Sequence, residues 1–344
     1  MLRVLSGLGD GVMQPAMCAL IARWSAPQYR STVVTGVFSG ASAGMVVGTL
    51  LAGVLCDYGG WSSMFYVFGI VGCVWSGAWF FLCYSSPAEH PRISVAERQY
   101  WTTVIGSSDL TAHPPTPWRK ILTSVPVWAL TVASFCDYTY LGMLICVPLF
   151  MYDVLGLNMT DNGVLSAVPF VASLIVLPLS GLLADILRAP GRLSTTAARK
   201  INVVVGFCLS GCLYILLGHT GCSRALAVTT MFILIGCTAV GWSAVAVNQM
   251  DLAPLHAGKI MGLTFEVGNL GIIAAPHVVS LLTAQGGTRS EWQNVFYLEA
   301  VVYAIGAVVF VVFGSGKRQS WADVVDDPSS REHSAVFSEN KRHN

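Results

Sequence analysis

Long apolar runs are the feature that most constrains this chain. A helix that crosses a bilayer needs about 20 mostly apolar residues, and 11% of the residues are charged where a soluble domain has roughly 25%. Nine such runs are found, at residues 4–22, 33–55, 62–84, 126–154, 163–187, 200–218, 226–248, 259–284 and 293–313. The pattern predicts an all-α polytopic membrane protein with about nine transmembrane helices.

Basic residues predict the orientation of these spans, because cytosolic connections carry an excess of Lys and Arg. Of the 19 basic residues, all except Arg3, Arg224 and Arg289 fall in alternate connections or in the C-terminal tail. That side is therefore expected to be cytosolic, and the C-terminus with it. The net charge of +1 gives no reason to expect a nucleic-acid partner.

One long polar connection divides the spans into three and six. We expect residues 1–84 to be the remnant of an N-terminal helical half, residues 85–125 a cytosolic linker between domains, and residues 126–316 a C-terminal half of six helices. The charged tail, residues 317–344, lacks apolar periodicity and is expected to be disordered. An odd number of spans with a cytosolic tail places Met1 on the opposite side, directly against the first span, so the chain is expected to be truncated.

Ionisable side chains inside spans are candidate functional residues, because each costs several kcal/mol to bury in lipid. Arg3 and Asp10 lie seven residues apart and so share one face of the first span. They could line a cavity, with Arg3 attracting an anion and Asp10 exchanging protons, or they could simply hold two helices together. Asp137, beside Tyr138 in the fourth span, could bind a coupling proton or make a packing hydrogen bond.

Further polar residues lie in the later spans. Glu266 and His277 lie eleven residues apart on about one face of the eighth span, where either could be functional or a satisfied polar residue. Glu299 falls early in the last run, where a structural, interfacial position is favoured. A helix boundary explains Asp251 after the seventh span, but explains Asn248 less easily.

Two local motifs lie at span ends. Gly181, Asp185, Arg188 and Arg192 resemble a latch, in which the glycine permits close helix packing and the aspartate caps a neighbouring helix and pairs with loop arginines. Asn158-Met-Thr160 is a glycosylation sequon in a short outer connection. The ten cysteines mostly fall inside apolar runs and show no zinc-binding spacing, so neither a metal nor a cofactor is expected.

Several strings together resemble one transporter family. They are RVLSGLGDGV from Arg3, GWSSMFYVFG from Gly60, SPAEHPRIS from Ser86, PWRKILTS from Pro117, STT from Ser194, NQMDLAP from Asn248 and EWQNVF from Glu291. They look like the anion–cation symporters of the major facilitator superfamily, which include sialin, the vesicular glutamate transporters and the type I sodium–phosphate transporters. The loop strings are most similar to the vesicular glutamate group.

The resemblance implies twelve spans in two halves, alternating access and a central site, with this chain beginning at the fourth helix. It implies secondary active transport of a small organic anion coupled to H⁺ or Na⁺, in a vesicular or lysosomal membrane rather than the plasma membrane. Arg3 matches the family's substrate-helix arginine, Asp10 its proton-linked acid, and the segment from Gly181 to Arg192 its cytosolic latch. We assign substrate binding to Arg3, Tyr138 and Asn248, and ion coupling to Asp10, Asp137 and Glu266.

Asp137 departs from the family pattern. Members that transport glutamate place an arginine where this chain has Asp137. A carboxylate there should repel glutamate, by several kcal/mol if the site is desolvated. We therefore expect a different anion, or a zwitterion whose amine meets Asp137.

Two alternatives stay open. The chain could be a truncated, non-transporting fragment of such a transporter. It could also be an intramembrane aspartyl protease, because Gly7-Leu-Gly9-Asp10 and Tyr152-Asp153 fit that family's motifs. Their order is reversed, however, and no Pro-Ala-Leu follows, so we expect that the chain is not an enzyme.

Overall fold

The computed structural model describes residues 2–87, 89–105, 116–156, 159–189, 192–221 and 223–322. Its regular elements are all helices within these ranges. They are α1 (Leu2–Trp24), α2 (Arg30–Gly59), α3 (Trp61–Leu82), α4 (Val95–Ile105), α6 (Trp118–Leu122), α7 (Val125–Asp153), α8 (Met159–Leu187), α9 (Thr195–His219), α10 (Arg224–Leu252), the short 3₁₀ helix η1 (Pro254–His256), α11 (Ala257–Leu282) and α12 (Arg289–Phe313).

Nine of these helices are long and apolar enough to span a membrane, counted over the described ranges. This confirms the predicted all-α polytopic class and the number of spans. The helices extend beyond the apolar runs at several ends; α2, for example, begins at Arg30, before the run that starts at residue 33. The first turn of α2, Arg30-Ser31-Thr32, is polar and was therefore not part of the apolar run. It lies at the end of the bundle, where a helical turn need not be apolar.

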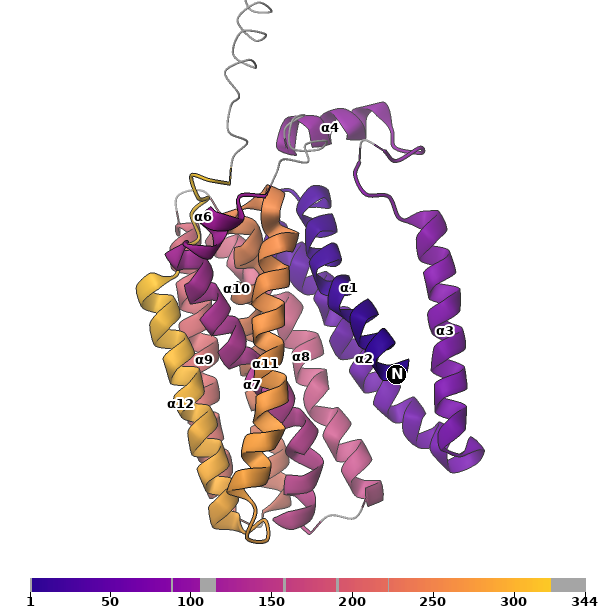
Figure 1. Cartoon of the computed structure of the whole chain (residues 1–344), viewed down its shortest axis with the longest axis vertical. Helices are drawn as coiled ribbons and strands as arrows, with labels where there is room; N and C mark the ends of the chain where they lie inside the picture. Colours follow the sequence, from indigo (N-terminus) through magenta and orange to yellow (C-terminus); the bar gives the residue numbers. More distant parts are fainter. Residues whose placement is uncertain are drawn as a thin grey trace, which may run out of the picture.

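The spanning helices form two groups (Figure 1). Helices α7–α12 make a compact bundle whose apolar core comes mainly from α7, α9, α10 and α12. Helices α1 and α2 pack beside this bundle, with α3 on their far side. No described side chain of α3 is buried, so its apolar surface is available to lipid.

A second apolar cluster joins the two groups near the end of the molecule that carries α4. It combines Cys18 and Val34, from α1 and α2, with Val247, Met250 and Met261, from α10 and α11. All five side chains are 4% exposed or less. We call this group the joining cluster; it closes the contact between the groups at that end.

The connection between the two groups contains structure of its own. Helix α4 lies above the ends of α1 and α3 and runs crosswise to them (Figure 1). Trp24, the last residue of α1, donates from Nε1 to the Tyr84 carbonyl oxygen at 3.1 Å, and its ring meets those of His90 and Trp101 edge-on, with centroids 6.1 and 6.5 Å away. These contacts hold the first part of the connection against α1.

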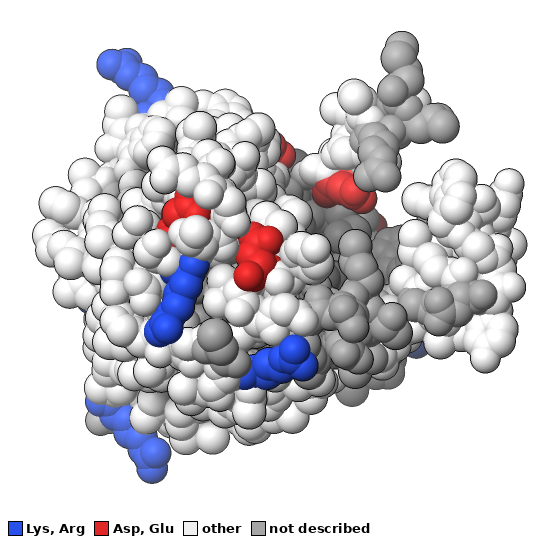
Figure 2. Space-filling model, turned by 90° about the horizontal axis from the view of Figure 1, so that it is seen from below, with Lys and Arg blue, Asp and Glu red and all other residues white. Residues whose placement is uncertain are grey.

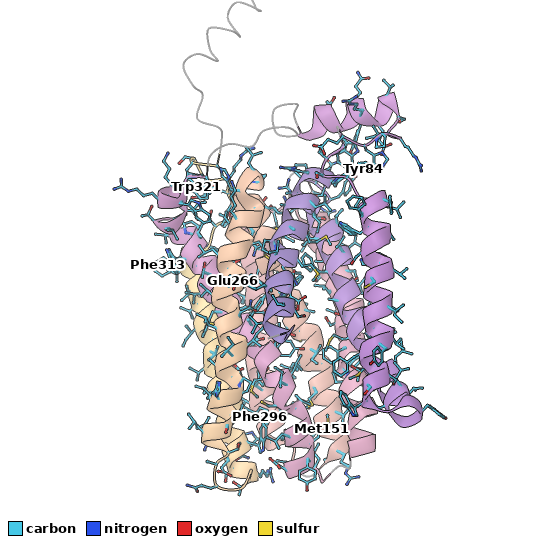
Figure 3. The ribbon with its side chains drawn as sticks, turned by 45° about the vertical axis from the view of Figure 1, so that its right-hand side comes forward. Tyr84, Met151, Glu266, Phe296, Phe313 and Trp321 are labelled. Atoms are coloured by element: carbon cyan, nitrogen blue, oxygen red, sulfur yellow. The ribbon has the colours of Figure 1, made fainter. Side chains whose placement is uncertain are left out.

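The C-terminal tail begins in a packed conformation, contrary to the expectation of disorder from residue 317. The Gln319 amide donates to the Leu252 carbonyl oxygen at 2.9 Å, and Ala322 is fully buried. Apolar side chains such as Trp321 (Figure 3) give these few residues a surface to bury. The remainder of the tail lies outside the described residues.

Charged side chains are few at the opposite end of the molecule (Figure 2). Arg224 and Arg289 begin α10 and α12 there, whereas the arginines at residues 30, 188 and 199 lie at the α4 end. This asymmetry follows the pattern from which the sequence predicts a cytosolic α4 end.

Glycine has a specific steric role where α2 meets α8. A Cβ atom on Gly181 would lie 2.6 Å from the Ser31 carbonyl oxygen, so only glycine allows this approach. Glycine also recurs at every fourth position of α2, but without such a contact. A Cβ on Gly36, Gly40, Gly44 or Gly48 would have no neighbour within 4 Å. The repeated small-residue spacing therefore marks no tight helix contact in this structure.

Replacing Gly181 with valine should force α2 and α8 apart. We expect Gly181→Val to destabilise the protein by about 2 kcal/mol, as is typical of overpacking, and to lower its melting temperature in detergent by several degrees. Gly40→Val is the matched control, because it places the same side chain in open space within the neighbouring helix. Equal melting temperatures for the two variants would contradict the close contact.

Candidate functional site

A cavity of about 320 Å³ lies between the two groups of helices. Its wall includes residues of α1, α2, α7, α8, α10 and α11. The polar and aromatic members are Gln14, Phe38, Ser42, Asp137, Tyr138, Tyr140, Phe170, Ser173, Thr238, Trp242, Phe265 and Asn269. We call it the central cavity. No described lining residue is basic.

Asp137 is the charged residue of this wall. It lies near the middle of α7, and its side chain is 3% exposed. Its Oδ1 atom has no hydrogen-bond partner, and neither ion pair found among the described residues involves it. A buried carboxyl group without a counter-charge is costly as an anion. The position therefore favours binding of a proton or of another cation.

Tyr138 is positioned by a glycine on α11. A Cβ on Gly268 would lie 3.0 Å from the Tyr138 ring, so the missing side chain makes room for that ring. The ring also meets Phe265 edge-on, with centroids 5.6 Å apart. Tyr138 is thus fixed in the wall, where it can pack against a bound molecule.

The contact between α1 and α11 brings two predicted coupling residues into one region. Glu266 lies midway along α11 (Figure 3), and its Oε1 atom is 3.6 Å from the position of a Cβ on Gly11. Asp10 precedes Gly11 and is exposed, as is Glu266. The Glu266 carboxylate therefore lies against α1 next to the residue that follows Asp10.

Four other candidates are not placed at the cavity. Asn248 is fully buried in α10, is not among the lining residues, and has no partner for either atom of its amide. Arg3 lies in α1, but its side chain is outside the described part of the structure, and Asn158 is outside it altogether. His277 is exposed on α11.

Glu299 differs from its expected interfacial position. Its side chain is 4% exposed, and Thr139 Oγ1 donates to its Oε2 atom at 3.0 Å. The expectation was wrong because α12 begins at Arg289, a turn before the apolar run. Thr288 and Glu291 form a capping box that starts the helix there. Recognising that box in the sequence would have placed Glu299 ten residues into the helix.

Asp185 joins the two groups of helices at the α4 end. Its carboxylate accepts hydrogen bonds from the Thr32 amide at 2.7 Å, the Thr32 hydroxyl at 2.9 Å and the Ser31 amide at 3.3 Å. These amides begin α2 and have no partner within that helix. An acid of α8 thus caps α2, and the positive end of the α2 dipole favours its charge.

Arginines surround this cap. Arg188 lies 3.4 Å from the Asp185 carboxylate, while Arg199 forms a buried ion pair with Asp251 at 2.7 Å and donates to Ser31 Oγ at 3.0 Å. Arg192 is exposed. Burial lowers the pKa of Arg188, but Asp251 and Asp185 oppose the shift, and a guanidinium starts so far above neutral pH that it stays charged. We call Asp185, Arg188, Arg199, Asp251 and Arg30 the seal.

Arg30 completes the seal from the first turn of α2. Its Nη1 atom donates to the Met250 carbonyl oxygen at 3.3 Å, and the side chain is buried. The seal and the joining cluster lie together at the α4 end, so the two groups of helices are in contact there.

Comparisons with known proteins identify the superfamily and the fold. The profile of the Major Facilitator Superfamily matches residues 1–276. The chain belongs to this superfamily. A solved structure of the proton:xylose symporter XylE, bound to 6-bromo-6-deoxy-D-glucose, superposes with a TM-score of 0.63 at 15% identity, over 87% of this chain and 68% of that one. This likeness confirms the fold.

Vesicular glutamate transporters are similar in sequence as well. Vesicular glutamate transporter 3 of Danio rerio is 39% identical over 326 residues, which are 93% of this chain and 55% of the relative. Vesicular glutamate transporter 2 of Homo sapiens is also 39% identical, over 93% of this chain and 56% of the relative. The chain thus spans about half the length of these relatives. They bear out the resemblance to the anion–cation symporters, and a superfamily of transporters is in line with a non-enzymatic role.

Loss of the Asp185 cap should loosen the joining cluster. Cys18 belongs to that cluster and is 1% exposed, so its reaction with a membrane-permeant maleimide reports opening. In a version whose other cysteines are replaced by alanine, Asp185→Ala should raise the labelling rate roughly fivefold, as a lost cap of about 1 kcal/mol implies. Asp153→Asn, at the opposite end, should leave the rate unchanged; equal rates in all three proteins would contradict the role of Asp185.

Proposed function

We propose that this protein is a secondary active transporter of a small organic anion that works by alternating access and is coupled to H⁺ or Na⁺. The observation that carries the proposal is the central cavity, which lies between two groups of helices and has a buried, unpaired carboxyl group, Asp137, in its wall. The seal and the joining cluster would close the cytosolic side in this conformation. Breaking the Asp185 cap and separating α2 from α8 would then expose the cavity to the cytosol.

Ion coupling is assigned to Asp137, Asp10 and Glu266. Asp137 lines the cavity, Glu266 lies against α1 beside Gly11, and Asp10 is the residue before Gly11 in α1. Each is a carboxyl group near the boundary that must rearrange during transport. Binding a cation at such a position removes a charge that would otherwise oppose closure around the substrate.

The substrate class follows from the charges of the cavity. Since the described lining offers Asp137 and no basic side chain, an anionic group would have to be met by Arg3 from the same α1 face as Asp10. A zwitterion would meet both of these side chains, with its carboxylate toward Arg3 and its amine toward Asp137. Tyr138 would pack against its apolar part. Glutamate, the substrate in the names of the relatives, is disfavoured by the Asp137 carboxylate.

Asn248 is the weakest of the substrate assignments, because it lies outside the described cavity wall. Its unpartnered amide could reach substrate only after α10 moves. We therefore propose that Asn248 contacts substrate only in the alternate conformation.

The membrane is proposed to be vesicular or lysosomal, by analogy with the relatives named vesicular. The tail would lie in the cytosol, as the basic connections indicate. Asn158 would then lie on the lumenal side, where glycosylation takes place.

Uptake into proteoliposomes tests the main proposal. Purified chain should accumulate at least one labelled compound from a panel of glutamate, sialic acid, urate, phosphate and a neutral amino acid when a pH gradient or voltage is imposed. Accumulation should collapse when the gradient is dissipated. Because the chain spans about half of its relatives, the alternative is a non-transporting fragment, and no uptake of any compound would favour it.

Asp137 should determine the pH dependence of uptake. Asp137→Asn keeps the shape of the side chain but cannot exchange a proton, so uptake by this variant should become nearly independent of pH between about 5 and 8. Asp153→Asn is the control, because Asp153 is exposed at the end of α7. A normal pH profile in Asp137→Asn would remove Asp137 from coupling.

A further inference from the structure

The central cavity presents hydrogen-bond acceptors without donors from both groups of helices. Oε1 of Gln14 in α1 and Oδ1 of Asp137 in α7 are buried and have no hydrogen-bond partner, and both residues line the cavity. An amide oxygen and an ionised carboxylate oxygen can only accept hydrogen bonds. Because a buried acceptor without a donor costs free energy, these two atoms favour a ligand that brings hydrogen-bond donors.

The hydroxyl groups of the cavity wall are hydrogen-bonded elsewhere. Ser42 Oγ and Ser173 Oγ lie 2.9 Å apart and bond to each other, and Thr238 Oγ1 donates to the Ile235 carbonyl oxygen at 2.9 Å. Basic side chains are absent from the lining that the structure describes. The Asp137 charge is therefore left for the ligand to compensate, so the cavity attracts a cationic group and repels an anionic one.

Aromatic rings cover another part of the wall. Phe38 of α2 and Trp242 of α10 both line the cavity. Their rings meet edge-on, with centroids 5.0 Å apart and planes at 67°, and so form a corner. Each side chain is only partly buried, which leaves ring surface for a ligand. A cation within about 6 Å of a ring centroid is attracted to the face of the ring, most strongly for tryptophan.

The cavity is small enough for one ligand to contact both groups of helices. Its volume of about 320 Å³ is at the lower end of the range for ligand pockets, roughly 300–1,000 Å³. Gln14 and Phe38 belong to one group of helices, whereas Asp137 and Trp242 belong to the other. A molecule of amino-acid size that fills the cavity would therefore bridge the two groups.

We propose that the central cavity recognises a protonated amine, whose N–H groups donate to Gln14 and Asp137 and whose charge is covered by the Phe38–Trp242 corner. The ligand class is a small molecule with a primary amine and a compact apolar body, and this part of the cavity does not require a carboxylate. Gln14 and Trp242 thereby become specificity-determining residues. The inference deepens the proposed function, on which it rests for the amine to be part of a transported substrate.

Four compounds that share one apolar body separate the amine from the carboxylate. They are leucine, 3-methylbutylamine, which lacks the carboxylate, 4-methylpentanoate, which lacks the amine, and 3-methylbutan-1-ol, which lacks both. Binding to the purified chain in detergent is measured by isothermal titration calorimetry at about pH 7, where an alkyl amine is protonated. We expect the two amines to bind at least about tenfold more tightly than the other two compounds, as hydrogen bonds to a charged group imply. Equal affinities for 3-methylbutylamine and 3-methylbutan-1-ol would overturn the proposal.

Substitutions in the wall test the two residues named. Gln14→Leu should weaken 3-methylbutylamine binding about tenfold and Trp242→Leu about fivefold. Gln99→Leu on α4 and Trp75→Leu on α3 make the same changes at exposed positions and should leave the affinity unchanged. Unchanged affinity in both Gln14→Leu and Trp242→Leu would contradict the amine site. Should either variant fail to fold, the comparison of the four compounds still decides, because it uses the unaltered chain.

The outcomes separate the amine site from the transport function, because binding needs no gradient. If 3-methylbutylamine binds as expected but no compound is taken up, the amine site stands and the proposed transport fails. If a carboxylate without an amine is taken up and 3-methylbutylamine does not bind, the transport stands and the amine site is overturned.

Discussion

The hydrogen bonds from the first amides of α2 to the Asp185 carboxylate hold the two groups of helices together at one end. They can form only because Gly181 lets α8 approach α2 so closely that a Cβ atom would meet the Ser31 carbonyl oxygen at 2.6 Å. Helix ends need partners for their free amides, and here the partner comes from the opposite group. Separating the groups therefore leaves three α2 donors, two amides and one hydroxyl, to water and frees the Asp185 carboxylate.

Burial without counter-charge dominates the middle of the molecule. Arg199 and Asp251 compensate each other in the seal, but Asp137 and Glu299 have no such partner among the described residues. A membrane protein that keeps unpaired acids in its interior gives up stability. Asp137 lines the central cavity, and the proposed cation binding there is a physical reason for keeping this acid.

The sequence was sufficient for the spans, because lipid demands long apolar runs that can be found without tertiary information. It also marked Asp137, whose charge stands out in the middle of a long run. Glu299 was misjudged because the start of α12 depends on the Thr288–Glu291 capping box, which is polar and lies before the run. Asn248 could not be placed either, since which face of α10 meets the cavity is decided by packing against α8, α9 and α11. The partner of Asp185 was foreseen only as a helix end; that it belongs to α2 required the three-dimensional structure.

The Trp24 contacts fasten part of the connection to α1. Trp24 ends the helix that carries Asp10 and Gln14, and its indole is bonded to the Tyr84 carbonyl oxygen while its ring rests against His90 and Trp101. As long as these contacts persist, Tyr84, His90 and Trp101 move together with α1. A movement of α1 would therefore also displace α4, which contains Trp101.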